Sequence, residues 1–109
     1  MVSAVAQFDV YDNPNVAQRE GFPYVVVIQS DHLDHYSTRF VLPLVRLQRP
    51  PRAAPRRLAS RVVVSGETLY LAVHLCAPLP ARLLRKAVGT LRHDAAVLAD
   101  AVDAVMSGV

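Results

Sequence analysis

The stretch SDHLDHYSTRF, at 30–40, is the densest cluster of residue types that could do chemistry. It holds two aspartates and two histidines that could ligate a metal ion: Asp31, His32, Asp34 and His35. Side chains three residues apart come together on a helix, but this stretch follows a strand-like segment. The sequence also offers no further Cys or His pair at metal-site spacing. We therefore expect a turn with exposed histidines and no metal.

Other reactive side chains lack partners that the sequence can identify. His74 falls in an expected strand and His93 in an expected helix, each without a base, acid or nucleophile at a recognisable spacing. Cys76 is the sole cysteine and has apolar neighbours, so we expect a buried structural thiol rather than a nucleophile. The glycines, at 21, 66, 89 and 108, cannot form a phosphate-binding loop. Nothing here indicates an enzyme or a cofactor.

One cluster keeps an enzymatic alternative open. Arg39 stands beside two hydroxyl side chains, Ser37 and Thr38. A basic residue next to a hydroxyl can support phosphodiester cleavage if a groove holds RNA.

The chain is long enough for one hydrophobic core, and we predict a single domain over 1–109. Apolar residues make up 52% of it, yet no run approaches the length of a membrane span. The first residues, MVSAVAQ, lack the features of a signal peptide. We therefore expect a cytoplasmic protein with no membrane partner.

Positive charge is concentrated in the middle of the chain. Six of the 12 basic residues fall between Arg46 and Arg61, and no acidic residue occurs between Asp34 and Glu67. The centre, RPPRAAPRR, carries three prolines and reads as an exposed basic loop. It could contact phosphates or an acidic partner, or simply be solvated. We expect it to be dispensable for folding.

The order of expected elements is a series of strands followed by a helix. Strand-like segments occupy 5–11, 23–29, 40–47, 61–65 and 68–75, and the last two flank a hairpin turn at Gly66-Glu67. Pro43 implies that its strand is an edge or is bulged. The segment 79–89 fits a short helix or a strand with a loop. These patterns predict an α+β fold of about five antiparallel strands with one C-terminal helix.

The C-terminal segment turns to helical periodicity at Thr90, a plausible N-cap. Its apolar residues recur at steps of three and four and predict one core-facing stripe: Leu91, Ala95, Leu98, Val102 and Val105. Polar residues take the opposite side: Arg92, His93, Asp100 and Asp103. Gly108 follows as a C-cap, with Val109 after it.

Taken in order, several short motifs resemble the CcdB family, the toxins of plasmid and chromosomal toxin–antitoxin modules. They are QFDVY, VIQSDHLD, VLPL and a helix ending in Gly plus an aliphatic residue, running from about Gln7 to Val109 with the basic loop as the divergent part. The resemblance implies an SH3-like antiparallel β-barrel, a homodimer and no catalytic activity. It implies a toxin that traps DNA gyrase on cleaved DNA by binding its GyrA subunit. It also implies a CcdA-like antitoxin, and repression of the operon by the toxin–antitoxin complex on operator DNA.

The resemblance also carries site residues onto this sequence. In the family the helix end binds gyrase, with a Trp-Gly-Ile terminus that falls here on Ser107, Gly108 and Val109. Met106 replaces an aromatic residue and Asp103 stands for a polar amide of the same face. The implied antitoxin site shares Asp103, Met106, Ser107 and Gly108 and adds His32 and Leu33. His32 replaces an apolar residue.

Three functions therefore stay open. The first is a gyrase toxin. The second is a diverged member that binds antitoxin but no longer poisons gyrase, because Ser107 cannot supply the anchor that tryptophan does. The third is a ribonuclease toxin of the MazF/Kid type, which shares the barrel and would use Arg39.

Overall fold

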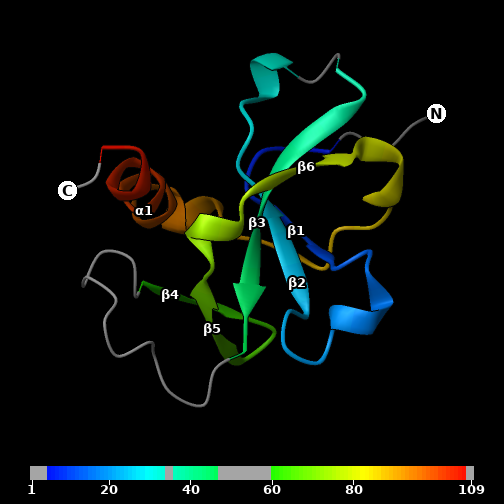
Figure 1. Ribbon diagram of the computed structural model, residues 1–109, viewed down its shortest axis with the longest axis horizontal. Coiled ribbons are helices and arrows are strands. Elements are labelled where there is room, and N and C mark those ends of the chain that lie inside the picture. The colour runs from blue at the N-terminus through cyan, green and yellow to red at the C-terminus, as the bar shows by residue number, and fades with distance from the viewer. Residues whose placement is uncertain (1–4, 34–35, 47–59, 108–109) are drawn as a thin grey trace.

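The computed structural model describes residues 5–33, 36–46 and 60–107, without the side chains of Leu33 and Ser107. Strands dominate the first part of the chain, and a single long helix, α1 (Ala95–Ser107), ends the described part. Figure 1 shows α1 on one flank of the strands. The expected basic loop, including 49–57, lies outside the described residues. No helix in the described part of the chain has the length and apolar character that crossing a membrane requires.

The strands form one antiparallel sheet that curls into a nearly closed barrel (Figure 1). Its members are β1 (Asp9–Asp12), β2 (Tyr24–Val27), β3 (Thr38–Val45), β4 (Arg61–Val64), β5 (Glu67–Leu71), β6 (Ala77–Pro80) and β7 (Gly89–Thr90). The pairing order is β4-β5-β3-β2-β1-β7, with β6 on β3. The predicted α+β barrel with one C-terminal helix is confirmed.

Two apolar clusters lie on the two faces of the sheet. Val26 of β2 packs with Val10, Leu42 and the helix residue Leu98, whereas its neighbours Val25 and Val27 pack in the other cluster. Successive residues of a strand point to opposite faces, so a strand with a core on each side must be apolar throughout. This is why β2 reads as an unbroken valine run.

β3 is a central strand, so the expectation that Pro43 marks an edge or a bulge was wrong. β2 pairs with one side of β3, and β6 and β5 share the other side. Along β3, the pairing with β6 ends at Val41 and the pairing with β5 starts at Leu44. Pro43 lies between them, and its carbonyl accepts the Ala72 N–H at 2.9 Å on that side. A residue's N–H and C=O point to the same side of a strand. The N–H group that Pro43 lacks would therefore point to the place where the partner of β3 changes from β6 to β5.

The β4–β5 hairpin is confirmed, but its turn lies one residue earlier than expected, because Glu67 already belongs to β5 and pairs with Val64. Ser65 and Gly66 both have positive φ, at 51° and 80°, which is the conformation of a type I′ two-residue turn. The segment 79–89 resolves into the end of β6, a single 3-10 turn at Ala81–Leu83, a loop and the start of β7. It is a strand with a loop and not a short helix.

The C-terminal helix begins later than the sequence predicts, and the set of its residues that is buried against the core also differs. Thr90 is not its N-cap, because Thr90 belongs to β7 and its hydroxyl accepts the Arg92 N–H at 3.2 Å in the turn before the helix. Ala101 and Ala104 are buried beside Leu98, whereas Val105 is 39% exposed. Val105 was therefore wrongly assigned to the core.

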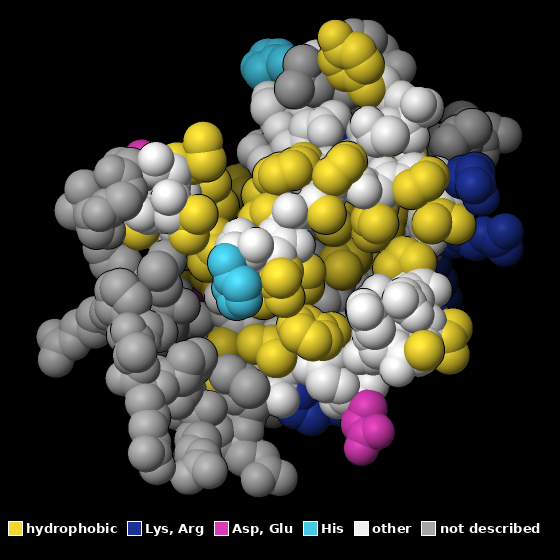
Figure 2. Space-filling model, in the orientation of Figure 1, with side chains coloured by type: hydrophobic (Ala, Val, Ile, Leu, Met, Phe, Trp, Pro, Cys, Tyr) yellow, Lys and Arg dark blue, Asp and Glu magenta, His cyan; other side chains and the backbone are white. Residues whose placement is uncertain are grey.

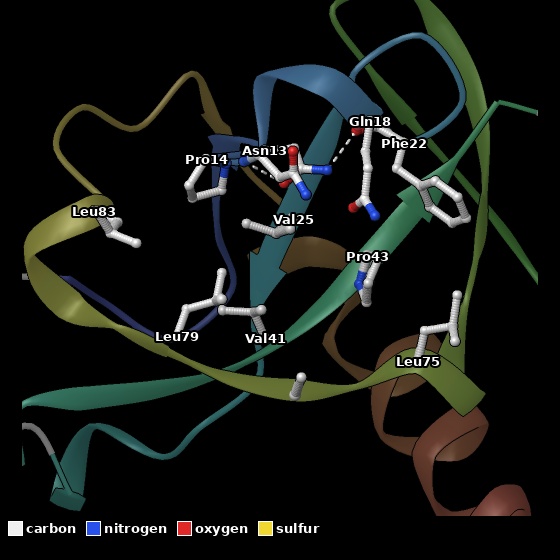
Figure 3. A pocket seen from close by; sticks show the side chains of 12 residues that line it. Asn13, Pro14, Gln18, Phe22, Val25, Val41, Pro43, Leu75, Leu79 and Leu83 are labelled. Carbon is white, nitrogen blue, oxygen red and sulfur yellow. Dashed lines mark hydrogen bonds between the residues drawn. The ribbon is translucent and has the colours of Figure 1, made fainter.

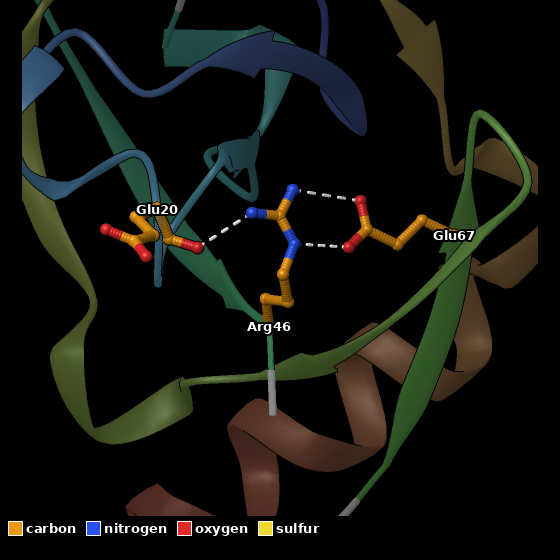
Figure 4. A network of polar contacts seen from close by, with 3 residues as sticks. All are labelled: Glu20, Arg46 and Glu67. Carbon is orange, nitrogen blue, oxygen red and sulfur yellow. Dashed lines mark hydrogen bonds and ion pairs between the residues drawn. The ribbon is translucent and has the colours of Figure 1, made fainter. Parts of the chain in front are cut away.

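An arginine at the end of β3 ties three segments together (Figure 4). Arg46 donates to the carboxylate of Glu67 through Nε and Nη2, and the distance from Nη2 to Oε1 is 3.1 Å. Its Nη1 donates to the Glu20 carbonyl at 2.7 Å, and its backbone N–H donates to the Gly21 carbonyl at 2.7 Å. The hydrogen bond from Arg46 lowers the pKa of Glu67. β3, the β4–β5 hairpin and the 20–21 turn are thus fixed where the basic segment begins.

Candidate functional site

The end of α1 presents polar and apolar side chains to solvent. Asp103 and Met106 lie three residues apart, on one side of the helix. Asp103 is exposed, and Met106 is 81% exposed, the most of any large apolar residue described. Ser107 closes α1 with its backbone. The Ser107 side chain, Gly108 and Val109, which complete the predicted gyrase surface, lie outside the described residues.

Asp103 and Met106 line a cleft of about 350 Å³ between α1 and the sheet. The helix contributes Leu98, Ala99, Val102, Asp103 and Met106; the chain around β1 and β2 contributes Gln7, Phe8 and Ile28. The cleft is mostly apolar with polar groups at its border, a composition that is typical of binding sites. Sequence reasoning missed its three sheet-side residues.

Phe8 owes its place in the cleft to an unusual backbone conformation. Its φ is +73°, which a bulky residue seldom adopts. Two hydrogen bonds hold it there: its N–H donates to the Val27 carbonyl at 2.7 Å, and its carbonyl accepts the Leu91 N–H at 2.8 Å. Strained residues of this kind concentrate at functional sites, which a one-dimensional pattern does not reveal.

The predicted antitoxin residues around His32 connect to the same cleft. Asp31–Leu33 form a single 3-10 turn in which Asp31 and His32 are exposed, as expected; the Leu33 side chain lies outside the described residues. Gln7 links this turn to the cleft. Its backbone N–H donates to Asp31 Oδ1 at 2.7 Å, and its Nε2 donates to the Ile28 carbonyl at 3.2 Å. Asp31 of this turn is thus joined by a hydrogen bond to Gln7, a residue that lines the cleft.

Arg39, the residue on which a ribonuclease would depend, is 8% exposed. Its Nη1 donates to the carbonyls of Tyr36 and Thr38, the latter at 2.9 Å. Burial raises the pKa of the nearby Tyr11 hydroxyl, Asp9 adds to this rise, and the charge of Arg39 opposes it. Arg39 therefore stabilises the start of β3 and does not line the cleft beside α1.

The remaining candidates form no reactive centre among the described residues. No three His, Cys, Asp or Glu side chains there are placed to share a metal ion, and Asp34 and His35 lie outside that part of the chain. His74 lies in a 3-10 turn at Val73–Leu75 and not in a strand, and His93 lies in the 3-10 turn Arg92–Asp94 before α1 and not in the helix. Both side chains are exposed, and His93 forms an ion pair with Asp94 at 3.2 Å. Cys76 is half-buried, and burial raises the pKa of its thiol to about 11. A thiol so rarely ionised is a weak nucleophile, as the structural assignment predicts.

A second, larger groove lies on the opposite face of the sheet from α1's core contacts (Figures 2 and 3). It has a volume of about 480 Å³. Its walls are β3, β6 and the segment 13–22, and Val25 and Val41 of the second apolar cluster form its floor. Figure 2 shows the hydrophobic side chains of this face as one broad area. The sequence patterns gave no indication of this groove.

A comparison with curated proteins gives no match. The family model described as "CcdB protein" matches residues 7–108, nearly the whole chain, including the sheet, the cleft and α1. The chain therefore belongs to the CcdB family, a family of non-enzymatic toxins of toxin–antitoxin modules that act on DNA gyrase.

Proposed function

We propose that this protein is a toxin that binds the GyrA subunit of DNA gyrase through the end of α1, and that a CcdA-like antitoxin neutralises it by covering the same end. The observation that carries the proposal is the exposure of Met106 beside the apolar cleft. A flexible thioether that is largely exposed is suited to fill a gap in a partner's surface. Family membership supports the same target.

The residues proposed to bind gyrase are Asp103, Met106, Ser107, Gly108 and Val109. Ser107 stands where the family has tryptophan, and a tryptophan anchor at an interface centre can contribute about 2 kcal/mol or more. We therefore expect weaker gyrase binding than a tryptophan at this position would give. Gly108, which has no Cβ, allows close approach of a partner backbone.

The residues proposed to bind antitoxin are His32, Leu33, Asp103, Met106, Ser107 and Gly108. The hydrogen bonds of Gln7 support placing both groups at one surface, because Gln7 joins the 31–33 turn to the cleft that Asp103 and Met106 line. An antitoxin bound there would exclude gyrase by overlap. Repression of an operon would then belong to the toxin–antitoxin complex on operator DNA.

A second function is favoured by one observation, the serine at 107. A protein that keeps the cleft but lacks the aromatic anchor could bind its antitoxin and leave gyrase unharmed. Such a protein would still belong to the family.

The deciding experiment is a DNA cleavage assay with purified gyrase and this protein. We expect cleaved DNA to accumulate with the wild type and not with Gly108→Glu, because the new side chain obstructs the contact. Val63→Glu, which changes a side chain 58% exposed on β4, is the matched control and should behave as the wild type. If the wild type causes no cleavage but binds antitoxin, the second function holds. If Gly108→Glu is as active as the wild type, the proposed surface is wrong.

We also propose a cytoplasmic homodimer. α1 carries two further exposed apolar side chains, Val97 and Val105, at 38% and 39% exposure, which a second helix could cover. Light scattering at micromolar concentration should give twice the 11.9 kDa chain mass. A chain mass that stays at the monomer value would contradict this.

A further inference from the structure

The groove between β3, β6 and the segment 13–22 has no part in the proposed gyrase and antitoxin surface. It shares no lining residue with the cleft beside α1. We propose that it is a second docking site, which binds a short segment of a partner protein that carries apolar side chains flanked by carboxylates. The proposal goes beyond the gyrase function and does not depend on it.

The shape and composition of the groove fit apolar side chains. Figure 3 shows Val25, Val41 and Pro43 between β6 and the loop that carries Asn13 and Gln18. Leu75 and Leu83 stand at opposite ends, with 44% and 39% of their surfaces exposed. Two leucines held open to solvent at the ends of a valine-floored groove leave a sizeable apolar area for a partner to cover.

The polar border of the groove is already organised. Asn13 is 6% exposed, its Nδ2 donates to the Phe22 carbonyl at 2.9 Å, and its Oδ1 accepts the Asn15 N–H at 3.0 Å. Arg19 Nε donates to the Asn13 carbonyl at 2.7 Å. These bonds fix the wall before any partner binds, so the ordering of this wall costs the complex little free energy.

The outer edge of β6 determines how a segment can bind. The Ala81 N–H donates to the Ser37 carbonyl at 2.8 Å, so alternate residues of β6 direct their N–H groups toward β3. Pro78 and Pro80 occupy the alternate positions, which face away from β3, and neither has an N–H to donate. A bound segment therefore cannot extend the sheet with a full ladder. It must bind through its side chains.

Charge at one end of the groove indicates a carboxylate-bearing partner. Arg82, Arg85 and Lys86 are exposed and follow or flank Leu83, and no ion pair within the described residues engages them. Figure 2 shows Lys and Arg side chains next to the hydrophobic area. No acidic residue lines the groove, and Asp12 lies on the opposite face of β1 from the inward-facing Tyr11. Carboxylates beyond the apolar residues of a partner would face the positive charges of Arg82, Arg85 and Lys86 at this end.

The test is selection from a displayed library of random peptides about 12 residues long, which covers one extended recognition segment. We expect enrichment of sequences that combine Leu, Ile, Val or Phe with Asp or Glu. The selected peptides are then made with a fluorescent label and measured by polarisation against the wild type and its variants. Folding of every variant is checked by circular dichroism.

Leu83→Glu and Leu75→Glu change the two ends of the groove, and each should weaken binding by about tenfold or more. Reversing Arg82, Arg85 and Lys86 to Glu should weaken binding strongly at low salt and less at high salt. Met106→Glu at the α1 cleft and Val63→Glu on β4 should leave binding unchanged. The proposal would be overturned if basic peptides were enriched or if no peptide were enriched. It would also be overturned if both leucine variants bound the selected peptides as tightly as the wild type does. Conversion of a dimer to a monomer by Leu83→Glu would overturn it too, since a second copy would then occupy the groove.

Discussion

Replacing Leu98 by alanine tests which face of α1 holds the helix on the sheet. Leu98 is 1% exposed and packs in the cluster that contains Val10, Val26 and Leu91. The other fully buried helix side chains are the alanines Ala101 and Ala104, which are too short to fill the space that the substitution leaves. Leu-to-Ala changes in cores cost about 2–5 kcal/mol, and we expect the middle of that range. For a domain of this size, about 3 kcal/mol corresponds to a fall in Tm of roughly 15 °C.

Val105→Ala is the matched control on the same helix. Because Val105 is 39% exposed, its truncation should cost less than about 1 kcal/mol in the free energy of unfolding. Thermal and urea unfolding, followed by circular dichroism at two well-separated protein concentrations, measure both variants. An effect that grows on dilution would identify a subunit contact. If Val105→Ala costs as much as Leu98→Ala at every concentration, the helix faces the core as the sequence periodicity predicted and our assignment is refuted.

Three further predictions concern the polar groups and the helix end. Arg46→Ala should lower the Tm by removing the Glu67 pair, and the loss should shrink in about 1 M salt. The pair lowers the pKa of Glu67, so its contribution to stability is complete above the ordinary pKa of 4.5 and is lost as the pH falls through the lowered pKa. The Tm values of the wild type and the variant should therefore converge in acid. A Tm difference that stays constant across pH would contradict this. Cys76, with a pKa of about 11, should react with iodoacetamide at pH 8 about a hundredfold more slowly than an ordinary thiol, and a normal rate would show that it is not buried as described. Ser107→Trp should lower the toxin concentration needed for half-maximal gyrase cleavage by about tenfold, and an unchanged value would exclude the aromatic anchor from the contact.

Much of the fold follows from local patterns. The valine runs of β2 and β4 and the turn glycine Gly66 each have a local physical cause, so these strands were predictable to within a few residues and the hairpin turn to within one residue. The site was predictable only through the family resemblance, because Asp103 and Met106 by themselves are an ordinary polar and an ordinary apolar residue on a helix.

Long-range pairing decided the rest. Pro43 sits in a central strand because the partner of β3 changes there, which no local pattern encodes. The Phe8 conformation depends on hydrogen bonds to Val27 and Leu91, distant in the chain, and these create the cleft beside α1. Arg39 is buried by the strands around it, which converts an apparent catalytic candidate into a structural one.

The sequence by itself determined five of the seven strands described, β1 to β5, together with the hairpin, the terminal helix and the family. Hydrophobic period and turn chemistry act within a few residues, so they can be read in one dimension. Only the tertiary structure decided which helix face is buried, what surrounds Met106, and that a groove opens between β3, β6 and the segment 13–22. Clefts and burial arise where segments far apart in the chain pack against each other, and the free energy of that packing belongs to the pair and to neither segment alone.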